Sequence, residues 1–226
     1  MFKEYTLSGL LILIFASVPM LTFAQREVAT QNFANTTDGS PVSVQKYEQI
    51  KGSAYLNEGW SDGIVKLKNG KSYKAKLKYD QVADELHFEN NGKELLFVNP
   101  VSEFKIEFTK DDKQQNFYFR NGFEANSEAF YQVLADGEIV LLKKARKVIV
   151  DKTPFNSATA VREFEPQNRY YLYRNNKLAP IKSNKKAVLA MLSEKKSQLD
   201  TFINREKLDL NDDEDLSKLI TYYNSL

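Results

Sequence analysis

The chain has 226 residues, a formal net charge of +2 and no cysteine. The absence of cysteine excludes disulfides, a thiol nucleophile and any zinc site that needs a thiolate ligand. With 32 basic and 30 acidic residues, no strong field is expected to attract nucleic acid, so we expect no nucleic-acid partner.

Residues 1–24 have the pattern of a secretory signal peptide. Lys3 gives a positive start, an apolar run occupies residues 7–18, and Ala24 closes a small-residue cleavage site. An apolar run of about a dozen residues is too short for a bilayer, which needs roughly 20. We therefore expect a mature chain that begins at Gln25, has no transmembrane span and is periplasmic or secreted. Without cysteine it has no lipid-modified anchor.

Residues 25–45 lack hydrophobic periodicity and are interpreted as a flexible lead-in. From residue 46 onward, short alternating runs are separated by Asx-Gly dipeptides, a strong short-range signal of β-hairpins. We predict strands at Val65–Lys68, Tyr73–Tyr79, Leu86–Glu89, Leu95–Val98, Phe104–Phe108, Phe117–Phe119, Phe130–Leu134 and Ile139–Leu142, and shorter ones at Lys147–Val150, Val161–Phe164 and Tyr170–Tyr173. The sequence thus predicts a mainly β domain at 46–181, an antiparallel meander sheet that is open or barrel-like.

The register of the first predicted hairpin follows from burial. A two-residue loop at 69–70 would place lysines on the apolar face. A three-residue loop at 68–70, with Gly70 left-handed, pairs Val65 with Tyr73 and separates apolar from charged residues. We predict this second register, a type I turn with a bulge.

After Pro180 the hydrophobic period changes from two to about 3.6. Ser183 is the predicted N-cap of a first helix, whose apolar stripe is Val188, Met191, Leu192, Leu199, Phe202 and Ile203. A second helix is predicted after Asn211, with acidic residues 212–215 at the positive end of its dipole. We predict that residues 182–226 form a helical hairpin that docks on the sheet as an appendage.

His87 is the only histidine and lies between two apolar residues of a predicted strand. If those residues face the core, alternation directs His87 to solvent, and a lone exposed imidazole makes neither a metal site nor a catalytic one. Residues 209–215 begin like a calcium loop, but Glu214 and Ile220 stand where glycine and glutamate are needed. The sequence predicts no metal, no cofactor and no catalytic residue.

One face of the first hairpin is the candidate site for an anionic ligand, and its lysines are Lys66, Lys74, Lys76 and Lys78. The alternative is a solvated sheet face whose charges discourage edge pairing, which overall neutrality favours. Trp60 and the tyrosines at 170, 171 and 173 could stack on a sugar, although strand aromatics are more often core. Asp80 and Asp84, which flank one turn, could in principle serve a glycosidase.

Three stretches of the sequence resemble stretches of other proteins. They are residues 60–80 (Trp, then Gly-Ile-Val-x-Leu-x-Asn-Gly, then Leu-Lys-Tyr-Asp), residues 130–142 (Phe-Tyr-Gln-Val-Leu, Asp-Gly, Leu-Leu) and the C-terminal Tyr-Tyr-Asn-Ser-Leu. Together they resemble a loose group of exported proteins of Bacteroidetes-type Gram-negative bacteria. The resemblance implies export and a β-then-helix order. It implies no activity, so it assigns no functional residue.

We therefore expect an exported, soluble envelope protein that is a non-enzymatic binding or structural module, whose partner is an envelope protein, a glycan or a lipid. Two alternatives stay open, a carboxylate-dependent hydrolase of envelope glycans and a carrier whose sheet curves around an apolar ligand. A polar cleft with two carboxylates about 5 to 9 Å apart would favour the hydrolase. A deep apolar pocket would favour the carrier.

Overall fold

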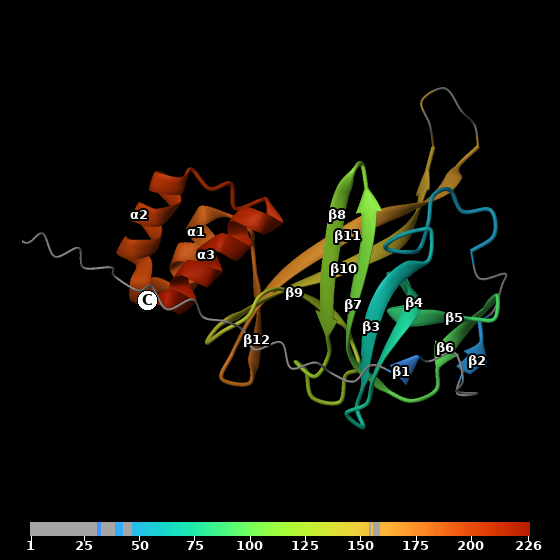
Figure 1. The fold of residues 1–226 in the computed structure, drawn as a ribbon. Coiled ribbons are helices and arrows are strands. Elements are labelled where there is room, and N and C mark those ends of the chain that lie inside the picture. The colour runs from blue at the N-terminus through green and yellow to red at the C-terminus, as the bar shows by residue number, and fades with distance from the viewer. Residues whose placement is uncertain (1–30, 33–38, 43–46, 154, 156–158) are drawn as a thin grey trace, which may run out of the picture.

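The computed structural model describes residues 31–32, 39–42, 47–153, 155 and 159–226. The predicted signal peptide at 1–24 and most of the predicted lead-in at 25–45 lie outside these ranges. In the described part an open antiparallel sheet of largely meander order is followed by helices that gather at one end of it (Figure 1). The predicted fold class is confirmed.

The strands are β1 (Gln31–Asn32), β2 (Gly39–Pro41), β3 (Ser61–Leu67), β4 (Ser72–Asp80), β5 (Glu85–Asn90), β6 (Lys93–Phe97), β7 (Val101–Lys110), β8 (Lys113–Arg120), β9 (Tyr131–Ala135), β10 (Val140–Lys152), β11 (Val161–Arg174) and β12 (Lys177–Ile181). They pair in the order β12-β11-β10-β9-β8-β7-β3-β4-β5-β6-β2, and β1 pairs β4 in parallel off this path. Within the predicted lead-in at 25–45, the described residues include β1 and β2, which pair with β4 and β6.

The β3–β4 hairpin has the predicted register. Val65 pairs with Tyr73, the Leu67 N–H donates to the Lys71 carbonyl at 2.9 Å, and Gly70 has a φ of 85°. Val65 and Tyr73 are buried, whereas the lysine between Val65 and Leu67 is exposed. Burial of one face selected this register, as expected.

The long β10–β11 hairpin differs from the prediction, which divided each of its strands in two. The ladder runs unbroken from Val140–Tyr173 to Lys152–Val161. The polar middle of β10 stays in the ladder because Lys143 and Lys144 form ion pairs at the sheet's two faces, with Asp213 and Asp84 respectively.

Strand β12 was not predicted. Its proline lies on an edge strand, where a missing N–H leaves the ladder intact.

Aromatic side chains fill the interior of the curved part of the sheet. We call Tyr79, Phe104, Phe119 and Phe130 the aromatic core; their ring centroids lie 4.8 to 6.3 Å apart. Just after β4, the Gln81 carbonyl accepts the Lys147 N–H at 3.1 Å, which holds β10 against this end of the sheet. The interior is therefore packed with rings.

The C-terminal segment forms α1 (Lys185–Met191), a 3-10 helix η2 (Ser193–Lys195), α2 (Lys196–Glu206) and α3 (Asp213–Ser225). The first predicted helix is thus divided, and its N-cap is Asn184 rather than Ser183, because the Asn184 side chain accepts the Ala187 N–H at 3.0 Å. At the division Glu194 accepts hydrogen bonds from Arg174 and the Tyr223 hydroxyl. The second helix begins after Asn211 as predicted.

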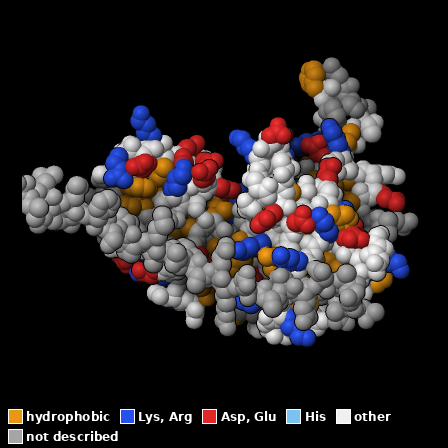
Figure 2. Space-filling view, viewed as in Figure 1, with side chains coloured by type: hydrophobic (Ala, Val, Ile, Leu, Met, Phe, Trp, Pro, Cys, Tyr) orange, Lys and Arg blue, Asp and Glu red, His pale blue; other side chains and the backbone are white. Residues whose placement is uncertain are grey.

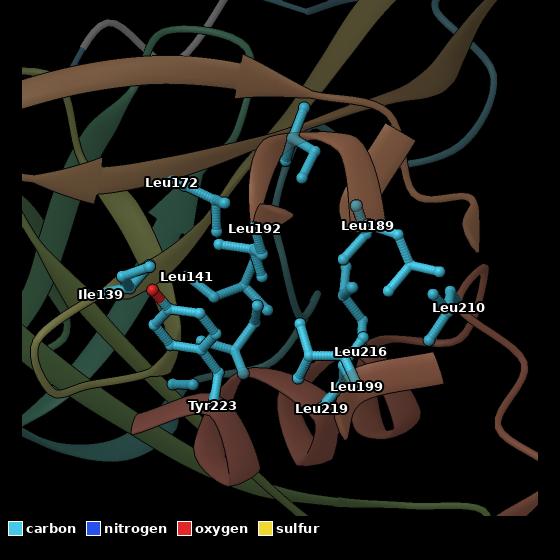
Figure 3. Close-up of a cluster of buried hydrophobic side chains, with 14 of the residues drawn as sticks. Ile139, Leu141, Leu172, Leu189, Leu192, Leu199, Leu210, Leu216, Leu219 and Tyr223 are labelled. Atoms are coloured by element: carbon cyan, nitrogen blue, oxygen red, sulfur yellow. The ribbon is translucent and has the colours of Figure 1, made fainter. Parts of the chain in front are cut away.

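The helices and the sheet share one hydrophobic core (Figure 3). Leu199, Leu216 and Leu219 from the helices pack in the same cluster as Leu141 and Leu172 from β10 and β11, and each is at most 5% exposed. The helices therefore dock on the face of β9–β12 through apolar contacts of the predicted stripe, with the exception of Met191, which is 44% exposed.

Candidate metal-binding site

His87 lies on β5 with its side chain fully buried, which differs from the solvent-exposed position expected from the sequence. Its neighbours Leu86 and Phe88 do face the aromatic core, and His87 does point to the other side of the sheet. That side is covered by residues 47–60, which we call the strap. The Tyr55 ring of the strap meets the imidazole edge-on, with ring centroids 5.7 Å apart.

The β4–β5 hairpin brings two carboxylates to the same side. Asp80 pairs directly across from Glu85, and Glu85 is two residues from His87 on one strand, so all three share a face. One ligand atom from each of Asp80, Glu85 and His87 lies within 4.8 Å of the others. With Glu94 from β6, these residues form what we call the His87 cluster.

The two imidazole nitrogens have different surroundings. Nδ1 lies 2.6 Å from Glu94 Oε1, whereas Nε2 is buried without a hydrogen-bond partner in the described part of the chain, 3.7 Å from Glu85 Oε2. In the neutral imidazole a carboxylate partner assigns the proton to Nδ1, and the lone pair on Nε2 is then directed toward the carboxylate side. Carboxylate, imidazole and an outward nitrogen lone pair are the arrangement that orients histidine ligands of metals.

Glu94 is held in its ionised form. Burial alone would raise its pKa, but hydrogen bonds from His87 and from the Tyr55 hydroxyl, together with the charge of Lys78, outweigh burial and lower the pKa below the usual value. The Tyr55 hydroxyl lies 3.0 Å from Glu94 Oε1, and Lys78 Nζ lies 3.7 Å from Oε2. Glu94 therefore keeps the imidazole in one tautomer and one orientation.

Asp80 is fully buried and is oriented by the turn that follows it. Its Oδ1 accepts the N–H groups of Val82 and Ala83 at 2.8 and 2.9 Å, and Oδ2 accepts the Tyr47 hydroxyl at 2.7 Å. Burial raises the pKa of Tyr47, and its bond to Asp80 raises it further, so the hydroxyl remains a donor. Three hydrogen-bond donors thus orient the Asp80 carboxylate.

An imidazole nitrogen with two carboxylates is a donor set for a first-row divalent ion such as Zn²⁺. Ca²⁺ and Mg²⁺ prefer ligand sets made of oxygen alone. Three protein ligands leave a fourth position for water, as in zinc sites of open coordination. The residues that could hold the ion are Asp80, Glu85 and His87, and Glu94 would support His87 from behind.

The predicted anionic-ligand face is of mixed charge. Three of its four lysines lie beside a carboxylate, namely Lys66 with Glu103 at 3.1 Å, Lys76 with Asp62 at 2.8 Å and Lys78 with Glu94 at 3.7 Å, and the fourth is the exposed Lys74. Figure 2 shows basic and acidic side chains interspersed over the sheet on the side in view. Of these lysines, Lys78 alone reaches the His87 cluster.

The aromatic residues considered for sugar stacking do not share a surface. The Tyr170 hydroxyl donates to Asp213 of α3 at 2.7 Å, on the helix side of the sheet. Tyr171 and Tyr173 pack on the opposite side, where the Tyr173 ring lies 5.0 Å from that of Phe123. Trp60 belongs to the strap, with Lys78 Nζ 4.7 Å from its ring.

The two acids considered for a glycosidase also lie in different surroundings. Asp84 forms an ion pair with Lys144 and accepts the Tyr79 hydroxyl, whereas Asp80 belongs to the His87 cluster.

In the stretch 209–215, which begins like a calcium loop, Asp212 caps α3 by accepting two backbone N–H groups at 2.9 and 3.1 Å. These contacts are structural.

The chain matches no protein-family model, no curated protein and no solved structure. The resemblance to exported proteins of Bacteroidetes-type bacteria therefore stays a prediction.

No helix in the described ranges combines the length and apolar character needed to cross a bilayer.

One feature of the sequence indicated part of this cluster. Glu85 and His87 alternate with apolar residues on a predicted strand, which places two ligand types on one face. Burial of that face depends on the strap, whose irregular backbone has no period that a sequence could reveal.

Proposed function

We propose that the chain is an exported envelope protein that acts as a non-enzymatic binding module, and that its ligand at the His87 cluster is a divalent transition-metal ion. The metal is proposed because Nε2 of His87 is buried, faces two carboxylates and has no hydrogen-bond partner among the residues that the structure describes. A buried polar atom without a partner costs free energy. An ion at this position gives Nε2 a ligand bond.

Charge supports the same ligand. Asp80, Glu85 and Glu94 bring three carboxylates to one imidazole, and Lys78 Nζ lies 3.7 Å from Glu94 Oε2. A dication attracts all of these carboxylates, most strongly where protein excludes water, which supports its binding.

The contacts favour binding over the two alternatives. A glycan hydrolase needs a carboxylic acid and a carboxylate exposed in a cleft, but Asp84 is neutralised by Lys144 and the His87 cluster lies under the strap. A carrier needs an internal cavity, but aromatic rings occupy the interior of the curved sheet. Export rests on the signal pattern of residues 1–24 and on the resemblance described above.

Isothermal titration calorimetry of the purified, tag-free protein with Zn²⁺ tests whether the His87 cluster binds a metal ion. We expect one ion per chain, at least tenfold weaker binding in His87→Gln and Glu85→Gln, and no competition from Ca²⁺ or Mg²⁺. Glu103→Gln is the matched control, because Glu103 also accepts a tyrosine hydroxyl and pairs with a lysine, outside the cluster. A wild-type protein that does not bind Zn²⁺, or binding that His87→Gln leaves unchanged, contradicts the proposal.

A further inference from the structure

The strap is anchored to the same carboxylates that face His87. The Tyr47 hydroxyl donates to Asp80 and the Tyr55 hydroxyl donates to Glu94, at 2.7 and 3.0 Å. Burial raises the pKa of both hydroxyls and their carboxylate partners raise it further, so both remain donors. One proposed metal ligand and the carboxylate behind His87 are therefore also the acceptors that hold the strap.

Other contacts hold the strap independently of the cluster. The Leu56 N–H donates to the Tyr79 carbonyl and the Gln81 N–H donates to the Ala54 carbonyl, each at 2.9 Å. Lys147 Nζ donates to the Ser53 carbonyl at 2.9 Å. Because these bonds remain when the cluster changes, the strap is expected to loosen locally rather than to leave the sheet.

We infer that a divalent ion at the His87 cluster tightens the strap over the sheet, so that metal availability regulates access to the sheet face beneath it. This inference rests on the proposed metal site. An ion bound to Asp80, Glu85 and His87 joins β4 to β5 beneath the strap. It holds Asp80 in the position where it accepts the Tyr47 hydroxyl, and it holds His87 against Glu94, which accepts the Tyr55 hydroxyl.

Coupling between the ion and the strap is reciprocal. If Zn²⁺ stabilises the closed strap by a given factor, opening of the strap weakens Zn²⁺ binding by the same factor, and loss of one anchor weakens it by no more than this. All three proposed ligands lie on the sheet, so the open protein still binds and the factor is moderate, about tenfold within the usual range of coupled sites. Tyr47→Phe and Tyr55→Phe each remove one anchor and leave every ligand in place.

Hydrogen exchange on the whole protein measures the strap directly. We expect saturating Zn²⁺ to slow exchange of the Leu56 and Gln81 amides by about tenfold. The Leu67 amide, which closes the distant β3–β4 turn, should not respond. The fluorescence of Trp60, the only tryptophan, reports the same change, because Trp60 ends the strap and Zn²⁺ is not a quencher.

Two substitutions distinguish coupling between Zn²⁺ and the strap from a general stabilisation of the protein by Zn²⁺. Tyr55→Phe should reduce the protection conferred by Zn²⁺ and weaken Zn²⁺ binding by a similar factor. Tyr118→Phe is the matched control, since Tyr118 donates to Glu103 at 2.6 Å in an equivalent pair away from the cluster. It should leave both quantities unchanged.

The outcomes distinguish this inference from the proposed function. Zn²⁺ that binds one to one without slowing the Leu56 and Gln81 amides overturns the inference and leaves the metal site standing. Faster exchange in Zn²⁺ also overturns it, because the ion would then be taking Asp80 from Tyr47. If Zn²⁺ does not bind, the proposed function fails and the inference fails with it.

Discussion

Glu94 Oε1 lies 2.6 Å from His87 Nδ1, and this contact determines which imidazole nitrogen can bind a ligand. The carboxylate takes the proton-bearing nitrogen, so the other nitrogen faces Glu85 and Asp80. Glu94, which lies two strands away from Asp80, thus determines which nitrogen of His87 faces the proposed metal ligands, although Glu94 is not one of them.

Glu94→Gln should weaken Zn²⁺ binding about 10- to 100-fold although it removes no ligand, because carboxylates that orient histidine ligands have effects of this size. Isothermal titration measures the change. The control is Glu103→Gln, which has the same kinds of partner at another place. Equal affinities for Glu94→Gln and wild type would show that Glu94 does not orient His87.

The pairing of Asp84 with Lys144 should be structural. Lys144 also donates to the Phe130 carbonyl at 2.8 Å, and its side chain is 12% exposed. Lys144→Met leaves Asp84 without its cation and should lower the free energy of unfolding by about 3 kcal/mol. Adding Asp84→Asn should recover part of the loss in urea denaturation. A double variant that is no more stable than Lys144→Met contradicts this assignment.

Stability should fall in acid partly through Glu103. Burial alone would raise its pKa, but hydrogen bonds from Tyr118 and Lys66 outweigh burial and hold the pKa below the usual 4.5. A carboxyl whose pKa is lower in the folded state stabilises the fold above its unfolded-state pKa and loses this contribution as the pH falls through the folded-state value. Between about pH 7 and about pH 3, urea denaturation should show a smaller loss for Glu103→Gln than for wild type. Identical losses would exclude a contribution from Glu103.

The helices and the aromatic core should be separable, as the sequence-based boundary at 181 predicts. Residues 25–181 alone should keep a β-type circular dichroism spectrum, because Phe104 and Phe119 pack without any helical residue. Loss of the helices uncovers Leu141 and Leu172, so the fragment should melt at lower temperature and self-associate. An unfolded fragment would place the helices within the folding unit of the sheet.

The export proposal predicts a defined N-terminus. Protein recovered outside the cytoplasm should begin at Gln25, because Ala24 ends the cleavage pattern. N-terminal sequencing, after removal of any cyclised glutamine, measures this directly. Retention of residues 1–24 in the exported protein would contradict it.

The fold was predictable where one face of an element is buried. Alternation along β3 and β4 and the left-handed Gly70 determined the first hairpin, and the stripe Leu216–Tyr223 determined α3. Prediction failed where tertiary contacts override local pattern. The polar middle of β10 stays in the sheet because its lysines find ion partners far away in the chain, and the first helix is divided where Glu194 binds Arg174.

The candidate site was only half predictable. Strand alternation correctly turned His87 away from the aromatic core, but the inference that it meets solvent was wrong, because the strap covers that face. Glu94 reaches His87 from another strand through a register that depends on the β5–β6 turn. Neither the cover by the strap nor the contact between Glu94 and His87 leaves a pattern in the local sequence, so the sequence alone predicted a lone histidine and no cluster.

The central claim, that Nε2 of His87 is a metal ligand, is most directly tested by nitrogen NMR of the imidazole, since the chain has one histidine. In tag-free protein, the account predicts that Zn²⁺ shifts the Nε2 resonance to that of a metal-bound nitrogen while Nδ1 keeps its proton. Imidazole resonances that do not change at saturating Zn²⁺, or a metal shift at Nδ1, would contradict it.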